Sequence, residues 1–195
     1  DRALLLDFQA ALETKPEKAI KLEKDALAQI ENITADNARL VSNLHANLGG
    51  LYRMNAHPDL AREHMEKSIS LLDQFNLLHI NDSIPQIANY AMFLTEQQEP
   101  ERGISELQKL SGIIKEYHSD DCLDYAKVQE TLGTIYLMTA NLPQAKTHFK
   151  RAFKIYEKIW ADEPEMIEAK YQEIQELYPQ IGFCIGKNLS GLLTK

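Results

Sequence analysis

The sequence predicts an all-α protein in which antiparallel helix pairs recur along the chain. Apolar residues return at helical spacing almost throughout, for example in residues 18–33 and 145–160, whereas strand-like alternation is missing. Several columns of similar residues also share one constant interval, which is typical of a repeat array. About ten helices joined by short turns are therefore expected.

The repeat interval is 42 residues. Five columns keep this step: Pro16, Pro58 and Pro100; Ala19, Ala61, Gly103 and Ala145; Gly49, Ala91 and Gly133; Tyr52, Leu94 and Tyr136; and Met65, Leu107 and Phe149. The step predicts four units, residues 1–33, 34–75, 76–117 and 118–160, followed by capping helices in 161–195, all within a single domain. Plausible caps at helix starts are Thr34 or Asp36, Asp59, Ser119 and Asn141.

Gly49 stands inside a predicted helix, where glycine costs roughly 1 kcal/mol relative to alanine. In the second to fourth units its column holds only small residues, as does the column of Ala61 in the following helix. We expect the two helices of a unit to cross closely where these small residues face each other. Larger side chains in the columns of Tyr52 and Met65 would fill the space beside the crossing.

Two stretches carry the motif Leu-Gly-x-x-Tyr followed by Ala, Phe and Ala. Residues 132–159 match it in full, and residues 48–69 match its first four positions. The motif resembles that of tetratricopeptide repeats, and residues 88–107 resemble a degenerate copy. In the first unit, Asp7 and Ala10 replace the Gly and the Tyr.

The resemblance implies a right-handed superhelical solenoid of antiparallel helix pairs. The interval of 42 residues departs from the 34 residues that are standard for this repeat. It resembles the longer repeats of the kinesin light chain group and of related bacterial proteins.

Composition excludes several functional classes. The chain has 195 residues, with 21 Lys and Arg against 29 Asp and Glu, and this balance argues against nucleic acid as a direct ligand. No apolar run approaches the roughly 20 residues of a membrane span, and the start does not resemble a secretory signal. With only Cys122 and Cys184, no disulfide framework is expected, and a cytoplasmic location is predicted.

Residues that could carry catalysis do not gather in the sequence. The six histidines are scattered without a His-Glu-x-x-His motif, the two cysteines lack zinc spacing, and there is no nucleophile elbow or phosphate-binding loop. The acidic residues between 163 and 176 would spread around a helix surface. We therefore expect a non-enzymatic protein without a cofactor or a bound metal.

The resemblance implies that the first helix of each pair lines the concave side of the solenoid. The groove residues that follow from it are Asn43, Asn47, Arg53, Met54, Asn89, Met92, Glu96, Lys127, Glu130, Thr131 and Thr134. Asn47, Asn89 and Thr131 share one repeat position, and side-chain amides at that spacing suit the backbone of an extended peptide. Alternatively, these side chains only bond to neighbouring helices.

A subtype of the family binds chaperones through a carboxylate clamp of Lys, Asn, Asn, Lys and Arg. Only Asn89 and Lys127 match this clamp, so the subtype is excluded. The charges predicted to line the groove cancel, and its methionines offer adaptable contacts. A partner segment of mixed polar and apolar character is therefore expected.

Two functions remain open. The leading hypothesis is a scaffold that holds a protein or peptide segment in its concave groove. The competing hypothesis is a peptide-sensing regulatory domain of a larger bacterial regulator or signalling ATPase, in which a bound peptide changes the curvature of the solenoid. A DNA-binding or nucleotide-hydrolysing domain in the same gene would favour the second.

Overall fold

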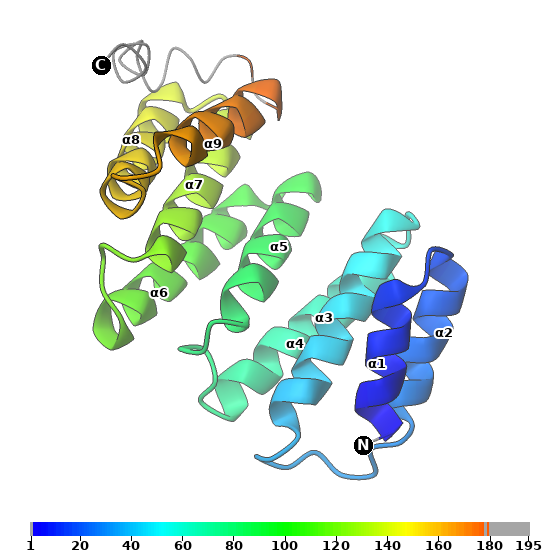
Figure 1. The fold of residues 1–195 in the computed structure, drawn as a ribbon. Helices are drawn as coiled ribbons and strands as arrows, with labels where there is room; N and C mark the ends of the chain where they lie inside the picture. The colour runs from blue at the N-terminus through cyan, green and yellow to red at the C-terminus, as the bar shows by residue number, and fades with distance from the viewer. Residues whose placement is uncertain (1, 178, 180–195) are drawn as a thin grey trace. The chain divides into compact units, whose positions relative to one another are not determined.

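The structure is a computed structural model that describes residues 2–177 and 179 (Figure 1). In this range it contains nine helices and no strand, which confirms the all-α prediction. The helices fall into two compact units, residues 1–93 and 94–195, and the division lies inside α5 (Ser83–Glu96). Cys184 and the part of the predicted capping region from residue 180 onward lie outside the described residues.

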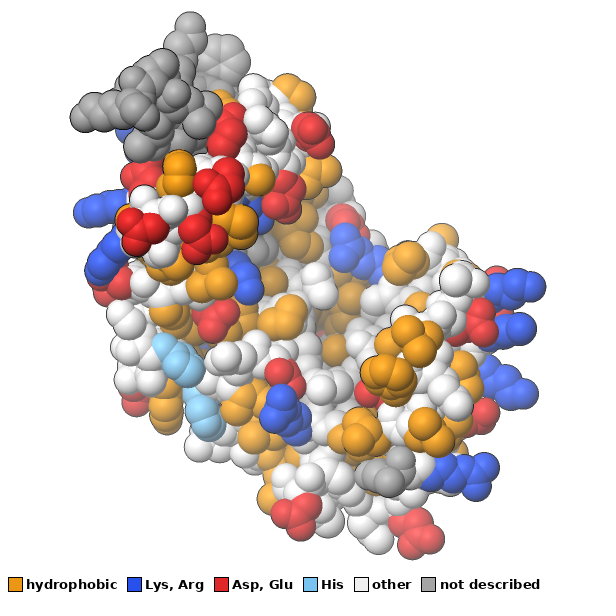
Figure 2. Space-filling view, viewed as in Figure 1, with side chains coloured by type: hydrophobic (Ala, Val, Ile, Leu, Met, Phe, Trp, Pro, Cys, Tyr) orange, Lys and Arg blue, Asp and Glu red, His pale blue; other side chains and the backbone are white. Residues whose placement is uncertain are grey.

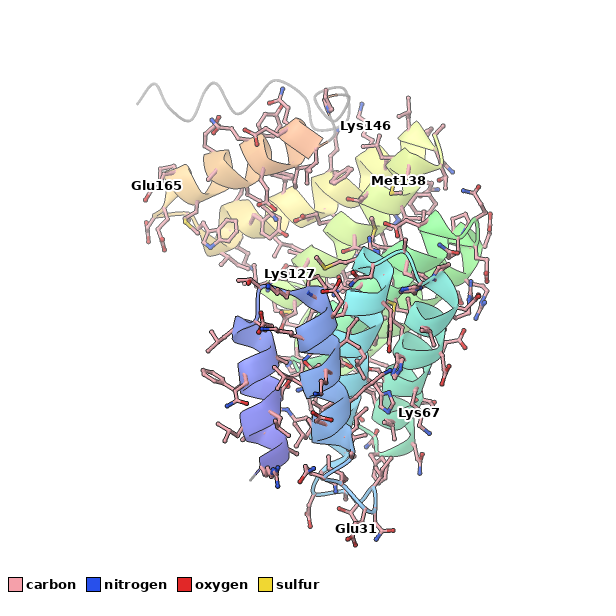
Figure 3. All side chains as sticks on the ribbon, turned by 90° about the vertical axis from the view of Figure 1, so that its right-hand side faces the viewer. Glu31, Lys67, Lys127, Met138, Lys146 and Glu165 are labelled. Carbon is pink, nitrogen blue, oxygen red and sulfur yellow. The ribbon has the colours of Figure 1, made fainter. Side chains whose placement is uncertain are left out.

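The first unit contains α1 (Arg2–Leu12), α2 (Pro16–Leu27), α3 (Ala38–Met54), α4 (Pro58–Gln74) and most of α5. Consecutive helices pack against one another, α1 on α2, α2 on α3 and α3 on α4, as Figure 3 shows for the blue and cyan helices. Ala26, Leu44 and Leu48 are completely buried among them. Apolar stripes of these helices thus form the core.

The second unit contains the end of α5, then α6 (Pro100–Tyr117), α7 (Leu123–Met138), α8 (Leu142–Ile159) and α9 (Pro164–Leu177). Here α6 packs on α7, α7 on α8 and α8 on α9. Leu132, Phe149 and Tyr156 are buried in its core. The helix α9 lies within residues 161–195, for which capping helices were predicted.

The turn inside three of the helix pairs has the same backbone conformation. Ala56, Gln98 and Ala140 lie 42 residues apart and have φ angles of 56°, 64° and 57°. The residue after each donates its N–H to a carbonyl five positions back, as His57 does to Tyr52 at 2.9 Å. This is the Schellman ending of a helix. Proline follows in the first turn of the next helix, where its missing N–H costs little.

The predicted helix caps were right at one position only. Asn141 caps α8, and its side chain accepts from the backbone N–H of Gln144 at 3.3 Å. Asp59 was a wrong prediction, because Pro58 already occupies the first helical position of α4. Ser119 was also wrong, since α7 begins after Cys122. The cap of α3 is Asn37, so neither Thr34 nor Asp36 holds that position.

The close crossing inside a helix pair is confirmed in both units. Gly49 is buried against Met65 where α3 crosses α4, and Gly133 is buried against Phe149 where α7 crosses α8. A side chain at either position would meet the neighbouring helix. The glycines therefore permit the contact that makes each pair compact.

Candidate functional site

A hollow of about 510 Å³ opens in the first unit. Its lining comes from α1, α3, α4, α5 and the loop before α5: Asp7, Asn43, Ala46, Asn47, Gly50, Arg53, Met54, Met65, Ser68, Asp82, Pro85, Gln86 and Asn89. Five of the predicted groove residues are therefore brought together, namely Asn43, Asn47, Arg53, Met54 and Asn89.

The helix α3 supplies the largest share of this lining, as its period explains. Residues 43, 46, 47, 50, 53 and 54 recur three or four positions apart from one helical turn to the next and so share one helix face. A Cβ at Gly50, in the middle of this face, would meet no atom within 4 Å. Gly50 therefore keeps the hollow wide, whereas the adjacent Gly49 permits a helix contact.

Asn47 joins three helices at one edge of the hollow. Its Nδ2 donates to Asp7 Oδ1 on α1 and to Glu23 Oε1 on α2, each at 3.0 Å. Glu23 is only 2% exposed, and in the described part of the chain its Oε2 has no hydrogen-bond partner. Burial, and then the charge of Asp7, raise the pKa of Glu23 to about 8. Burial also raises the pKa of Asp7.

The repeat explains the position of these two carboxyls. Asp7 and Glu23 stand 42 residues before Gly49 and Met65, the pair in close contact between α3 and α4. At the equivalent crossing of α1 and α2, in the first repeat, two acids thus replace a small residue and an apolar one. The departure of Asp7 from the motif is visible in the sequence. The sequence analysis did not identify Glu23 as a site residue. Its position could have been found by counting one repeat interval back from Met65.

A polar network joins α5 to α3 and α4. Gln86 Oε1 accepts from Ser42 Oγ at 2.9 Å and from Ser68 Oγ at 2.6 Å. Gln86 Nε2 donates to Asn43 Oδ1 at 2.6 Å. Both serines are buried, whereas Asn43, Ser68 and Gln86 line the hollow, so the network forms part of its wall. Asn43, a predicted peptide contact, thus has its amide oxygen engaged within the protein.

The lining combines charged, polar and apolar groups. Asp82 lies 2.6 Å from the guanidinium of Arg39, and this hydrogen bond holds the pKa of Asp82 below its usual range. Arg53 adds a positive charge to the lining. Asn89 is an exposed amide, and Met54 is 80% exposed. The hollow can therefore offer hydrogen bonds and dispersion contacts to the same ligand.

The other predicted groove residues do not line this hollow. Met92 belongs to the first unit and is half-buried. The rest belong to the second unit: Glu96, Lys127, Glu130, Thr131 and Thr134. Glu96 is exposed in the last turn of α5. Lys127 lines a separate hollow of about 270 Å³ together with Trp160.

Glu130 contacts side chains of its own chain. Its carboxylate accepts the Tyr156 hydroxyl at 2.6 Å and lies 3.0 Å from Lys170 Nζ on α9. Burial, and then the charge of Glu130, raise the pKa of Tyr156. Thr131 likewise donates its hydroxyl to the carbonyl of Lys127 at 3.0 Å. Glu130 therefore holds α9 against α7 and α8.

Two histidines that look unrelated in the sequence meet between α3 and α4. Their Nδ1 atoms, in His45 and His64, lie 2.8 Å apart, and the ring of His64 stacks on Tyr52 at 5.4 Å between centroids. Burial lowers the pKa of His45 to about 4 and also lowers that of His64. They line a further hollow with Lys67, which Figure 3 places on α4 away from α1. Among the described residues, no three His, Cys, Asp or Glu are arranged to hold a metal ion.

A family model and solved structures agree with the repeat pattern. The family model described as tetratricopeptide repeat matches residues 83–158. No curated protein sequence matches the chain. In the described part of the chain, no helix combines the length and the apolar character needed to cross a membrane.

Solved structures share the fold. BtubC (BKLC) from P. vanneervenii matches with a TM-score of 0.72 at 18% identity, over 92% of this chain and 72% of its own. A putative kinesin light chain from Podosopora anserina with nearly identical TPR-like repeats has a TM-score of 0.63 at 13% identity, over 74% and 68%. A variant of that protein gives 0.65 at 13% identity, over 75% and 69%. The predicted fold class, a solenoid of helix pairs, is confirmed.

Proposed function

We propose that the chain is built of tetratricopeptide repeats of the long, kinesin-light-chain-like kind, and that the hollow of its first unit binds an extended peptide segment of a partner protein. Tetratricopeptide repeats generally serve as non-catalytic scaffolds for protein interaction. One observation carries the proposal: the hollow of about 510 Å³ is lined by amide side chains at the same position of consecutive repeats.

The spacing of these amides suits a peptide backbone. Asn47 on α3 and Asn89 on α5 are 42 residues apart, and both line the hollow. Packed helices lie about 8–10 Å apart, and an extended chain rises about 3.3 Å per residue. An extended peptide would therefore pass from one amide to the next in roughly three residues. Because an amide both donates and accepts, it can bond peptide groups of either kind.

Asn89 should contribute more to binding than Asn47. Asn47 Nδ2 already donates to Asp7 and to Glu23, so only its oxygen can serve a ligand. Asn89 is exposed, and its side chain makes no hydrogen bond within residues 2–177. Its whole amide can therefore face a peptide. A change at Asn89 also avoids the structural cost of leaving two carboxyls without their donor.

The test selects 12-residue peptides from a random phage library against the whole chain. We expect selected peptides to bind, and Asn89→Ala to weaken them about fivefold, or about 1 kcal/mol, without changing the melting temperature. Gln74→Ala is the matched control, because Gln74 is exposed at the end of α4 and outside the lining. If no peptide is selected, or if Gln74→Ala weakens binding equally, the proposed function is wrong.

A further inference from the structure

We propose that the edge of the hollow at Asp7 and Glu23 is a subsite for a basic side chain, Lys or Arg, of a partner segment whose neighbouring apolar residues cover α1. This inference rests on the peptide-binding function proposed above and adds the chemistry of the ligand. Two independent observations support it: an acidic pair without a cation, and an exposed apolar helix face beside it.

The acidic pair lacks positive charge. Among the described residues, no Lys or Arg pairs with Asp7 or Glu23, and the donor between them is the neutral amide of Asn47. Glu23 Oε2 is buried and has no partner in this part of the chain. A buried, unpartnered carboxylate oxygen costs free energy when it is charged. A bound cation would supply the missing charge.

The pair is within reach of a ligand in the hollow. Asp7 and Asn47 line the hollow, and Glu23 bonds directly to Asn47, so its carboxyl lies one side chain behind the wall. A Lys or Arg side chain can lay its apolar stem along such a wall while its charged head meets the carboxyl of Asp7, close to that of Glu23. Asp82, the other acid of the lining, is already paired with Arg39. Arg53, the positive charge of the lining, stands six residues after Asn47 and thus about 9 Å further along α3 than the amide that contacts the acidic pair.

An apolar face of α1 adjoins the acidic pair. Its side chains are 54–71% exposed, and they appear as the orange group over α1 in Figure 2: Leu4, Leu5, Phe8 and Leu12. One repeat interval later the same positions hold residues 46, 47, 50 and 54, all of which line the hollow. The exposed face is thus the equivalent of the groove wall in the first repeat, and Asp7 directly precedes Phe8 in the sequence.

The charge and the composition of this surface define the occupant. Apolar side chains beside carboxyls that lack a cation complement a segment in which Leu, Ile or Phe flanks a Lys or Arg. The chain carries a net charge of −8, which also favours the approach of a basic segment.

Binding should release a proton. The pKa of Glu23 is about 8, raised by burial and by Asp7 from α1 and lowered by the hydrogen bond of Asn47 from α3, so the carboxyl holds a proton at pH 7. A cation at this edge favours the charged carboxylate, and the proton leaves to solvent. The affinity for a basic peptide should therefore rise between pH 6 and pH 9.

The experiment uses the peptides selected from the random library. We expect Lys or Arg beside apolar residues among them, and replacement of an Arg by its uncharged isostere citrulline should weaken binding at least tenfold at pH 8. The combined change Asp7→Asn and Glu23→Gln should remove this preference. The matched control, Glu17→Gln with Asp25→Asn, replaces the same two residue types at exposed positions on α2 and should keep the preference.

The outcomes separate this inference from the proposed function. Peptides that lose affinity with Asn89→Ala, but tolerate citrulline at every pH, would overturn the basic subsite and leave the peptide-binding function standing. Selection of no peptide would overturn both. Sedimentation equilibrium tests whether a second copy of the chain occupies the apolar face of α1. A dimer that Phe8→Ser dissociates would show that it does, and would overturn the inference. If the double variant does not fold, the citrulline comparison and its pH dependence on the unaltered chain decide.

Discussion

Gly49 lies so close to Met65 that a Cβ added to it would stand 2.5 Å from Met65 Cγ and 3.2 Å from the Met65 backbone nitrogen. The same Cβ built on Gly50 would meet no atom within 4 Å. Two adjacent glycines of one helix therefore have different roles. Gly49 permits the crossing of α3 and α4, and Gly50 leaves room in the hollow.

This difference predicts opposite effects of one substitution. Gly49→Ala should destabilise the fold by about 1–3 kcal/mol, because the new methyl group displaces Met65 and the backbone of α4. Gly50→Ala should stabilise it by up to about 1 kcal/mol, since alanine is the better helix former where nothing is crowded. Urea unfolding followed by circular dichroism measures both. Equal losses for the two variants would contradict the assignment.

A second prediction concerns the contribution of Gln86 to the free energy of unfolding. One interval before and after Gln86 stand Leu44 and Val128, both fully buried, so Gln86→Leu restores the residue type of the repeat. The substitution nevertheless removes an acceptor that the Ser42 and Ser68 hydroxyls share. We expect a loss of about 1–3 kcal/mol in the free energy of unfolding.

The matched control for Gln86→Leu removes the hydroxyls as well. Adding Ser42→Ala and Ser68→Ala should recover most of the loss, because no buried polar group is then left without a partner. The unfolding free energies of the single and the triple variant give the comparison. A triple variant that is less stable than Gln86→Leu would show that the network is not the cause.

The sequence predicted the helix pairs because their contacts are local. The crossings at Gly49 and Gly133 need small residues in neighbouring helices. Because these small residues recur at the repeat interval, they can be recognised in one sequence. The resemblance to tetratricopeptide repeats also indicated which face of α3 forms the wall of the hollow. Helix caps were harder to predict, since Asp59 is as good a cap by type as Asn141, and only the position of the proline decides between them.

The partners of the groove residues could not be predicted. Asn47 bonds to Asp7 and Glu23, which lie 40 and 24 residues away on two other helices. Glu130 was predicted to face a peptide and instead bonds to Tyr156 and Lys170. Whether a polar side chain meets a ligand or a neighbour depends on contacts between helices, and a repeat position does not encode them.

His45 predicts a pH dependence of stability. Burial lowers its pKa to about 4, whereas a histidine of the unfolded chain titrates near about 6.5. Between these values the unfolded state binds more protons than the folded state, so stability falls as the pH is lowered from about 6.5 to about 4. His148, whose pKa burial also lowers to about 4, adds to the same effect.

The repeat itself supplies the substitution that tests this dependence. Two intervals after His45 stands Gln129, whose Oε1 lies 2.9 Å from His148 Nδ1, so His45→Gln copies an existing pair. The loss of stability between pH 6.5 and pH 4.5 should be smaller in this variant than in the unaltered chain. His118→Gln, at an exposed position, should leave the loss unchanged. An unchanged loss in His45→Gln would mean that other groups cause it.

The ion pair between Lys170 and Glu130 is expected to hold α9 against the rest of the second unit. The Nζ of Lys170 lies 3.0 Å from Glu130 and 3.2 Å from Glu173, and the side chains of Lys170 and Glu130 are only 20% and 18% exposed. Lys170→Met should cost about 1–2 kcal/mol, between the values for surface and buried ion pairs. The expected readout is faster hydrogen exchange of the α9 amides, with exchange in α3 and α4 unchanged.

Lys158→Met is the matched control for Lys170→Met. Lys158 pairs with Asp121, but these side chains are 65% and 53% exposed, so water screens their attraction. Exchange in α9 should therefore stay as it is in the unaltered chain. Equal acceleration in both variants would show that loss of any lysine charge loosens α9, whereas acceleration in Lys170→Met alone would attribute the attachment of α9 to the half-buried pair with Glu130.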